Sequence, residues 1–292
     1  MLPFLQLFMT LTWLVIVIRN RRPGSTVRET SLRNAWLWSR AAEFAWLLSS
    51  LLSIAIPKKV ALLDQFWYWT AILTICPLIA VLGSRRPTVR VWNGFIILPL
   101  LAVLGWPALT VLPLGSELAP IRIQAPVFLG FLLVMVMGAG NYVGTRFSFP
   151  AVMTALGVCF VLRTFSVSFS GSEYAAAWSR LSASALVSAA VLLARFQAWR
   201  PTSETSAFDH LWFDFRDAFG IVWALRIQER INQTARKEKW ACELGPIGFE
   251  WKPDIDEAER QHTLERIDHT LRWHLRRFVD PGWIDRRLQA RE

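Results

Sequence analysis

The chain has 292 residues, of which 53% are hydrophobic, and it carries 16 tryptophans and a formal net charge of +10. Its mean hydropathy of +0.33 excludes an ordinary soluble domain, which needs far less apolar sequence to build its core. Residues 1–200 hold 17 basic and 5 acidic residues, whereas residues 201–292 hold 15 basic and 17 acidic ones. The positive charge therefore belongs to the apolar part, where membrane lipids account for it, and we expect no nucleic-acid partner.

Seven apolar segments follow one another, each close to the roughly 20 residues that a helix needs to cross a bilayer. Lipid cannot satisfy backbone N–H and C=O groups, so these segments must be helices. The predicted fold is all-α: a polytopic integral membrane helical bundle over residues 1–199, followed by a cytoplasmic helical-hairpin tail over residues 200–292. The expected spans are Leu2–Ile18, Trp36–Ile56, Val60–Leu82, Val91–Leu114, Ala125–Val143, Ala151–Phe169 and Tyr174–Ala194.

The arginines predict the orientation of this bundle. Basic residues follow the first segment instead of preceding it, which argues against a cleaved signal peptide and favours a translocated N-terminus. An odd number of spans then leaves the tail in the cytoplasm. The outward loops carry only Lys58, Lys59 and Arg122, as positive-inside sorting requires. The inward loops carry Arg19, Arg21, Arg22, Arg28, Arg33, Arg85, Arg86, Arg90, Arg146, Arg195 and Arg200.

Composition and aromatic residues add to this topology. Arginine outnumbers lysine 27 to 5, which is typical of GC-rich coding, and the expected location is a bacterial inner (cytoplasmic) membrane. The aromatic run "FWYW" at Phe66–Trp69 is interpreted as a marker of the outer membrane interface.

Two segments contain motifs that shape helix packing. Pro99, Pro107 and Pro113 predict that the fourth segment is kinked or broken, as in ordinary packing or at a transporter's midplane site. Gly140 and Gly144 have the spacing that lets two helices approach closely, and Asn141 between them can bond across helices. The neighbouring helix belongs to the same bundle or to a second copy, so a homo-oligomer stays open.

Two arginines lie within apolar segments. Arg163 is expected past the midpoint of the sixth segment and Arg180 near the outer end of the seventh, at similar depth. An arginine in hydrocarbon costs at least about 2.5 kcal/mol, so each should face the bundle interior and find acceptors. Asp64 and Glu173 are the nearest ion-pair partners by depth. The four groups are interpreted either as an ion-pair network or as a site where Arg163 and Arg180 bind a lipid phosphate or a carboxylate.

The tail is expected to fold as two antiparallel helices. Ser206 and Asp209 have the spacing of a helix start, and "DPG" at residues 280–282 follows the end of the second helix. Apolar side chains recur at helical spacing in an arc too wide for a solvated helix. We interpret this arc as a docking face, which buries against the membrane surface, the other helix or a protein partner. Its members are Phe208, Trp212, Phe215, Phe219, Trp223, Ile267, Leu271 and Leu275.

The chain lacks the side chains on which most membrane enzymes depend. No histidine precedes His210, and Cys76, Cys159 and Cys242 stand alone, so we expect no haem, copper or zinc site. No phosphate-binding loop occurs, and Glu259-x-x-His262 lacks the second motif of a di-metal site. We therefore expect no cofactor, no metal and no catalytic residue.

Two functions stay open. The first is a non-catalytic integral membrane subunit whose cytoplasmic hairpin docks a protein partner or packs on the membrane surface. The second is a transporter or lipid-active membrane protein that binds an anionic substrate near the outer leaflet through Arg163 and Arg180. The aromatic tail favours the first function, and the two arginines favour the second.

Overall fold

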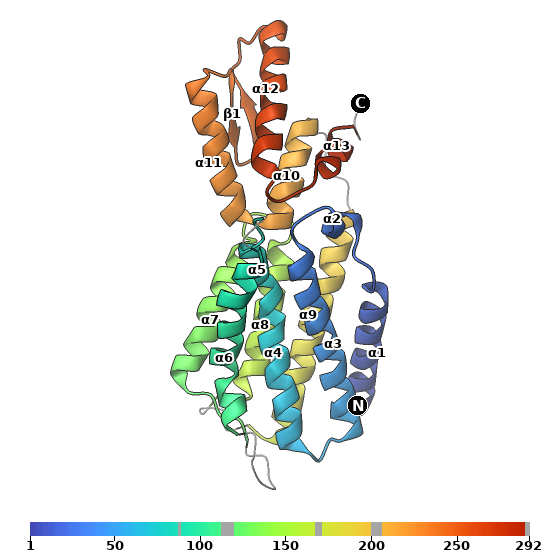
Figure 1. Ribbon diagram of the computed structural model, residues 1–292. Coiled ribbons are helices and arrows are strands. Elements are labelled where there is room, and N and C mark those ends of the chain that lie inside the picture. Colours follow the sequence, from blue (N-terminus) through green and yellow to red (C-terminus); the bar gives the residue numbers. More distant parts are fainter. Residues whose placement is uncertain (87–88, 112–119, 167–170, 200–205, 290–292) are drawn as a thin grey trace.

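The computed structural model shows a mostly helical chain and describes residues 1–86, 89–111, 120–166, 171–199 and 206–289. The helical segments of residues 2–199 lie side by side in a bundle, here called the body, and the described residues from 206 onwards form a smaller unit, the tail, at one end of it (Figure 1). The N-terminus lies at the opposite end of the body (Figure 1). The predicted segment ends Leu114 and Phe169, and the predicted start of the tail at residues 200–205, lie outside the described residues.

The body consists of long helices and one irregular segment. A short helix, α2 (Ser25–Arg28), lies between the first two long helices. The long helices and the parts of the irregular segment are α1 (Leu2–Arg19), α3 (Arg33–Ala55), α4 (Val60–Leu82), α5 (Val89–Trp92), the π-helical η1 (Asn93–Ile97), α6 (Leu98–Thr110), α7 (Ala125–Gly140), α8 (Ser148–Arg163) and α9 (Glu173–Trp199).

Three helices in the described part of the chain, α1, α4 and α9, are long and apolar enough to cross a membrane. The segment Gly94–Thr110 and helices α7 and α8 are apolar but shorter. Of these three helices, α4 is the most deeply placed: 67% of its apolar stretch is buried, against 22% for α1 and 28% for α9. Helix α4 is therefore the centre of the bundle, and α1 and α9 lie on its outside.

Three buried tryptophans hold helices together around α4. The rings of Trp13 and Trp46 are stacked with centroids 5.4 Å apart, and Trp67 packs edge-on against Trp46 at 5.5 Å. A buried indole N–H needs an acceptor, because leaving it without one costs about 1–3 kcal/mol. Trp13, Trp46 and Trp67 donate to the hydroxyls of Ser184, Thr74 and Ser53, at 2.8, 2.9 and 3.0 Å.

The fourth apolar segment is irregular, as its prolines predict. A π-helical turn over Asn93–Ile97 precedes α6, in which Pro99 lies in the first turn and Pro107 lies inside the helix. Each proline lacks the N–H that would continue the helical ladder. The hydroxyl of Tyr68 donates to the Leu104 carbonyl at 2.7 Å and so fixes this helix against α4.

Gly140 and Gly144 do not bring two helices of this chain together, contrary to the prediction. No heavy atom lies within 4 Å of the position that a Cβ would take at either residue. Gly144 instead has a φ of +76° in the turn after α7, which glycine adopts without strain. Other glycines lie in close contacts between helices, among them Gly157, where a Cβ would stand 2.4 Å from the side chain of Val187 in α9. Packing of a second copy on Gly140 stays a prediction.

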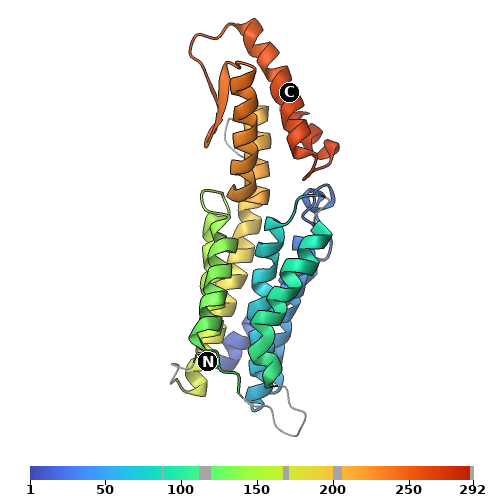
Figure 2. The same cartoon turned by 60° about the vertical axis from the view of Figure 1, so that its left-hand side comes forward.

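The tail contains four helices and a β-hairpin in place of the expected helix pair, and it continues the long axis of the body (Figure 2). Its first helix starts as predicted, with the Ser206 hydroxyl accepting from the Asp209 N–H at 3.2 Å. The single helix that the sequence predicted here is divided into two at Gly220. Pro281 of the "DPG" sequence begins a further helix, at a position where a backbone N–H would have no partner within the helix. The elements are α10 (Ala207–Phe219), α11 (Ile221–Lys237), the antiparallel strands β1 (Cys242–Gly245) and β2 (Gly248–Trp251), α12 (Glu257–Leu275) and α13 (Pro281–Gln289).

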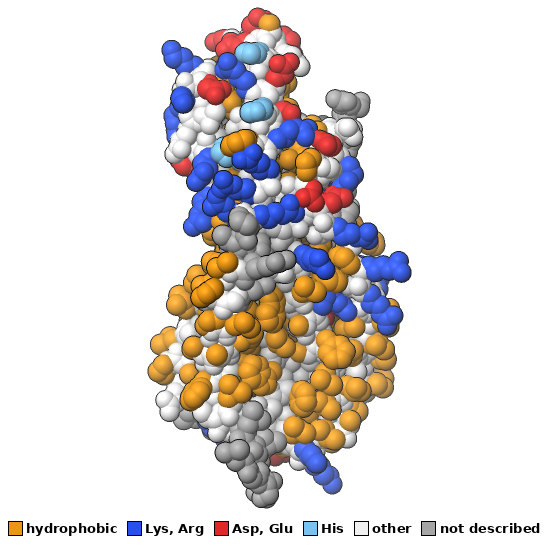
Figure 3. Space-filling model, viewed as in Figure 1, with side chains coloured by type: hydrophobic (Ala, Val, Ile, Leu, Met, Phe, Trp, Pro, Cys, Tyr) orange, Lys and Arg blue, Asp and Glu red, His pale blue; other side chains and the backbone are white. Residues whose placement is uncertain are grey.

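The surfaces of the body and the tail differ in chemistry. On the face that Figure 3 shows, hydrophobic side chains cover the body, whereas charged side chains predominate on the tail. Among the large hydrophobic side chains that are exposed in the described residues, only Leu225, Ile247 and Trp273 belong to the tail. An apolar surface as extensive as that of the body is typical of a protein in contact with lipid.

Candidate functional site

A cavity of about 530 Å³ lies at the end of the body remote from the tail, and we call it the distal cavity. Helices α1, α3, α4 and α9 contribute to its walls. Four charged side chains line it, namely Asp64, Arg122, Glu173 and Arg180. Two carboxylates therefore face two guanidiniums, and the lining has no excess of either charge.

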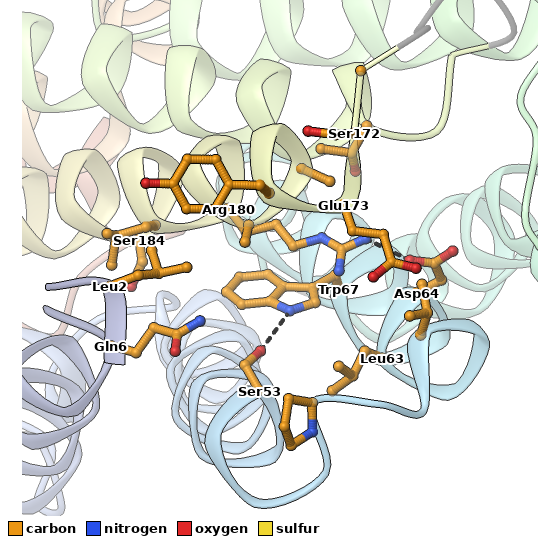
Figure 4. A pocket seen from close by; sticks show the side chains of 18 of the residues that line it. Leu2, Gln6, Ser53, Leu63, Asp64, Trp67, Ser172, Glu173, Arg180 and Ser184 are labelled. Atoms are coloured by element: carbon orange, nitrogen blue, oxygen red, sulfur yellow. Dashed lines mark hydrogen bonds and ion pairs between the residues drawn. The ribbon is translucent and has the colours of Figure 1, made fainter. Parts of the chain in front are cut away.

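Arg180 of α9 and Asp64 of α4 form an ion pair in the wall of this cavity (Figure 4). Only 12% of the Arg180 side chain and 11% of the Asp64 side chain are exposed. The exposed carboxylate of Glu173 lies next to the guanidinium (Figure 4), and the guanidinium carbon is 5.8 Å from the centre of the Phe165 ring. Mutual attraction offsets the cost of removing both charges from water. The structure thus brings Arg180, Asp64 and Glu173 together.

Arg163 does not join this group. It is the last residue of α8, its side chain is exposed, and it is not among the residues that line the distal cavity. Val158 and Val161 lie on the buried face of α8, and two residues beyond Val161 a helix has turned by about 200°. The sequence placed Arg163 at the depth of Arg180, but depth along an axis does not determine the direction of a side chain.

One donor of Arg180 has no partner among the described residues. Its Nε is buried and makes no hydrogen bond there. A buried N–H without an acceptor costs about 1–3 kcal/mol, so this group favours any acceptor that enters the distal cavity. The cavity could thus hold a small polar group, although the balanced charges of its lining give little attraction for an anion.

A second buried network joins three helices at the end of the body nearer the tail. Glu43 pairs with Arg40 one turn earlier in α3, and it accepts a hydrogen bond from the Asn20 amide at 2.6 Å. Arg195 of α9 donates to the other end of the Asn20 amide. The network closes α1 and α9 onto α3 and leaves the Glu43 carboxylate with two donors.

Asn141 connects the body to the tail. We call the region where these two units meet the joint. Its side-chain amide donates to the Phe219 carbonyl at 3.1 Å and accepts from the Val222 N–H at 3.0 Å. Its own carbonyl accepts from the Ile221 N–H at 2.7 Å. Gly220, at φ +79° and ψ 175°, makes this approach possible, because a Cβ there would stand 2.1 Å from the Asn141 amide nitrogen.

The loop before α3 forms a second part of the joint. Thr30 and Val279 make an isolated antiparallel bridge, so the corner between α12 and α13 pairs with a body loop as two strands do. Two flanking bonds, each 2.8 Å long, run from the Ser31 N–H to the Phe278 carbonyl and from the Asp280 N–H to the Glu29 carbonyl.

Trp223 of α11 connects the tail directly to α4. Its indole N–H donates to the carbonyls of Val81 and Leu82, at 3.3 and 3.1 Å, in the last turn of that helix. The last carbonyls of a helix have no partner in the regular helical ladder. Here Ser84 and the tail both donate to Val81, and the tail also donates to Leu82. The Trp223 ring also packs edge-on against Phe278, with centroids 4.9 Å apart. The buried core of the tail is therefore continuous with that of the body near Ile79.

Arg146, in the turn between α7 and α8, binds two carboxylates of α10. Its guanidinium nitrogens lie 2.7 Å from an oxygen of Asp214 and 2.9 Å from an oxygen of Asp217. Arg287 of α13 approaches the second oxygen of Asp214 to 2.7 Å. Burial raises the pKa of Asp217, and the charges of Arg146 and Arg216 oppose that rise. A cavity of about 820 Å³ lies beside this network, between apolar side chains of the body and the acids of α10.

The side chains predicted to form a docking face lie in the interior of the tail. Phe208 is half-buried, and the other seven are buried. The arc is wide because several elements of the tail pack against it. In the folded tail these side chains are therefore not exposed to a protein partner. The buried members are Trp212, Phe215, Phe219, Trp223, Ile267, Leu271 and Leu275.

Sequence analysis missed most of the residues that build the joint. Asn141 was expected to bond to a helix of the bundle or of a second copy, and it binds the tail instead. Two signals point to the joint in retrospect. Gly220 interrupts a helical pattern, and Asp214 and Asp217 place two carboxylates one turn apart among apolar residues, which indicates a buried cation. Nothing near Arg146 distinguishes it from the other arginines of the loops.

No protein-family model matches the chain, and no curated protein and no solved structure is similar to it. The function must therefore be inferred from the chain's own contacts.

Proposed function

We propose that the body crosses the membrane seven times, with the N-terminus outside and the tail in the cytoplasm. The number of helical segments and the opposite positions of the N-terminus and the tail support an odd number of crossings. The arginines that the sequence assigns to inward loops support the direction, because cytoplasmic loops retain basic residues. Arg86 and Arg146, two of them, pair with carboxylates of the tail.

Reporter tags test this topology. One tag is inserted between Lys58 and Lys59, in the turn between α3 and α4, and another is fused after Glu292. We expect an enzyme added outside intact cells to reach the first tag only. Access to both tags, or to neither, contradicts an odd number of crossings.

We further propose that the chain is a non-catalytic membrane subunit that holds a folded cytoplasmic tail in a fixed orientation for a protein partner. The contacts at the joint support this proposal. Hydrogen bonds from Asn141, the bridge at Thr30 and the buried Trp223 fix the tail from three directions. A flexible tether would be sufficient to hold a partner near the membrane, whereas three separate contacts are needed to orient it.

The exposed surface of the tail indicates the kind of contact that a partner makes. It is mainly charged, and Ile247 at the tip of the β-hairpin is its most exposed large hydrophobic side chain, at 79%. A polar interface around one apolar anchor is typical of complexes whose members also exist separately.

Purification from native membranes in a mild detergent tests the subunit proposal. We expect a stoichiometric partner with the natural chain, and loss of that partner with Gly220→Ala, which disrupts the joint. Gly24→Ala is the matched control, because a Cβ there meets nothing within 4 Å. A chain that purifies alone contradicts the subunit proposal. A partner that stays bound to Gly220→Ala shows that a fixed orientation is not required.

The distal cavity supports a second candidate, the binding of an anionic group near the outer leaflet. The buried Nε of Arg180 supports it, and Arg122, which lines the cavity, takes the place expected for Arg163. Retention of phosphatidic acid by the purified chain, measured by native mass spectrometry, is the test. We expect Arg180→Gln to lower retention and the control Arg163→Gln to leave it unchanged. Equal loss in both variants contradicts a role for the cavity.

A further inference from the structure

A cleft of about 880 Å³ opens between α11 and α12 and reaches the body at Arg85, three residues beyond the end of α4. We call it the basic cleft. On the face that Figure 3 shows, basic side chains gather where the tail meets the body. The tail as a whole has two more acidic than basic residues, so this gathering is local and does not reflect its net charge.

The lining of the basic cleft has an excess of positive charge. Four arginines line it, Arg85, Arg226, Arg230 and Arg277, together with a single carboxylate. That carboxylate, Glu229, accepts from Gln233 at 3.0 Å and pairs with Arg236 at 3.4 Å, so its charge is engaged along its own helix.

Three of these arginines have no acid to neutralise them. Within the part of the chain that the structure describes, no carboxylate pairs with Arg226, Arg230 or Arg277. Like charges brought together in a concave wall repel one another and attract an anion.

Aromatic rings support the guanidiniums and place the cleft at the membrane. The Arg226 guanidinium carbon lies 5.0 Å from the centre of the Trp223 ring, and Trp223 is bonded to the last carbonyls of α4. Trp273, which is 54% exposed, forms another part of the wall. Tryptophan and arginine together are typical of protein surfaces at the level of lipid headgroups.

His274 also lines the cleft and lies close to its arginines. Burial lowers its pKa, and the charges of Arg230 and Arg276 lower it further. The imidazole therefore stays neutral at cytoplasmic pH, and the arginines carry the positive charge of the cleft.

We propose that the basic cleft binds the phosphate of an anionic phospholipid from the leaflet that faces the tail. Guanidinium forks match phosphate oxygens in pairs, and several of them converge here. The site lies next to the end of α4, so a headgroup can reach it while its acyl chains stay beside the body. This assignment of the leaflet rests on the proposed orientation, whereas binding of the headgroup itself does not.

Native mass spectrometry of the full chain in a nonionic detergent tests the proposal without any membrane orientation. Phosphatidylglycerol is titrated into delipidated protein, and phosphatidylcholine, which has no net charge, serves as the control lipid. We expect Arg230→Gln/Arg277→Gln to bind phosphatidylglycerol roughly thirtyfold more weakly, because each basic residue near a headgroup contributes about a factor of five. The matched control is Lys237→Gln/Arg266→Gln, with the same charge change on α11 and α12 but outside the cleft and with no contact to Glu229.

Three outcomes decide the matter. Loss of affinity in the cleft variant but not in the control variant supports the site. Equal affinity in the two variants overturns it. Inorganic pyrophosphate that binds the natural chain and is not displaced by phosphatidylglycerol overturns the lipid assignment, because the site would then serve a soluble phosphate. Resistance of the tail to protease shows that each variant is folded.

Discussion

The body and the tail distribute polarity in opposite ways. The body exposes large apolar side chains such as Phe95 and Leu133 and buries hydroxyls such as those of Ser49 and Thr70, which hydrogen-bond to each other at 2.8 Å. The tail buries a cluster of stacked aromatic rings and exposes charge. This distribution is the one expected of a chain with one part in lipid and the other in water. In lipid a polar group must find its partner inside the protein, and in water an apolar group must find its neighbours there.

The largest effect is expected in the body, from Asp64→Asn. It removes the buried counter-charge of the Arg180 guanidinium and leaves only the exposed Glu173 carboxylate beside it, and the loss of one member of a buried pair costs about 3 kcal/mol. The free energy of unfolding of the body, measured in mixed micelles by tryptophan fluorescence, should fall by that amount. Asp64→Leu combined with Arg180→Met should recover most of it. A double variant as unstable as Asp64→Asn would show that the pair is not the cause.

The next effect belongs to the tail and results from Gly220→Ala. A residue with a Cβ is strained at this backbone conformation by about 2 kcal/mol, and the Cβ collides with Asn141. We expect protease to cleave the tail much faster while the unfolding midpoint of the body stays unchanged. A body that loses stability in step with the tail would show that the two units unfold together.

A smaller effect within the body is expected from Trp13→Phe. The change removes the hydrogen bond to the Ser184 hydroxyl but keeps an aromatic ring against Trp46, so it costs about 1 kcal/mol. Mixed-micelle unfolding measures it. Trp199→Phe, at a side chain that is 72% exposed, is the control and should have no measurable effect.

The smallest effect is a pH dependence confined to the tail. The pKa of His274 is lower in the folded chain than its ordinary value of 6.5, so below pH 6.5 the unfolded chain takes up the proton first. The stability of the tail should therefore fall as the pH drops from 7.5 to 5.5, and His274→Gln should lessen the fall. Hydrogen exchange of α12 amides is the measurement. An unchanged slope in His274→Gln would assign the effect to another group.

Hydrophobic length allowed the sequence to locate the helices of the body, but it did not reveal which way side chains point. The apolar segments match α1, α3, α4 and α7 within three residues, whereas α8 ends at Arg163, before the predicted end Phe169, and α9 runs five residues beyond the predicted end Ala194. Trp67 and Tyr68, interpreted as a membrane-interface pair, are buried in the core of the body. Arg163, expected at the depth of Arg180, is not among the residues that line the distal cavity. The direction of a side chain depends on how α4 packs against the other helices, and the sequence of a single segment does not encode that packing.

The tail was harder to predict because its pattern is ambiguous. Apolar spacing runs through Gly220 without a change of phase, so one long helix and two short ones look alike. The wide apolar arc correctly indicated that these side chains are buried, but it did not show what buries them. In the structure they pack against α12, α13 and the β-hairpin. The joint depends on contacts between residues nearly eighty positions apart, such as Asn141 and Phe219, which local patterns do not encode.

Helix α4 reaches from one end of the body to the other. Its first turns carry Asp64 in the wall of the distal cavity, and its last turn, about 27 Å further along the axis at Leu82, accepts the Trp223 indole of the tail. A rod fixed at both ends transmits axial displacement. A displacement of Asp64 along the helix axis should therefore also move the contact between α4 and Trp223. The exception is a bend of the helix at Pro77, which lacks the N–H of one helical hydrogen bond.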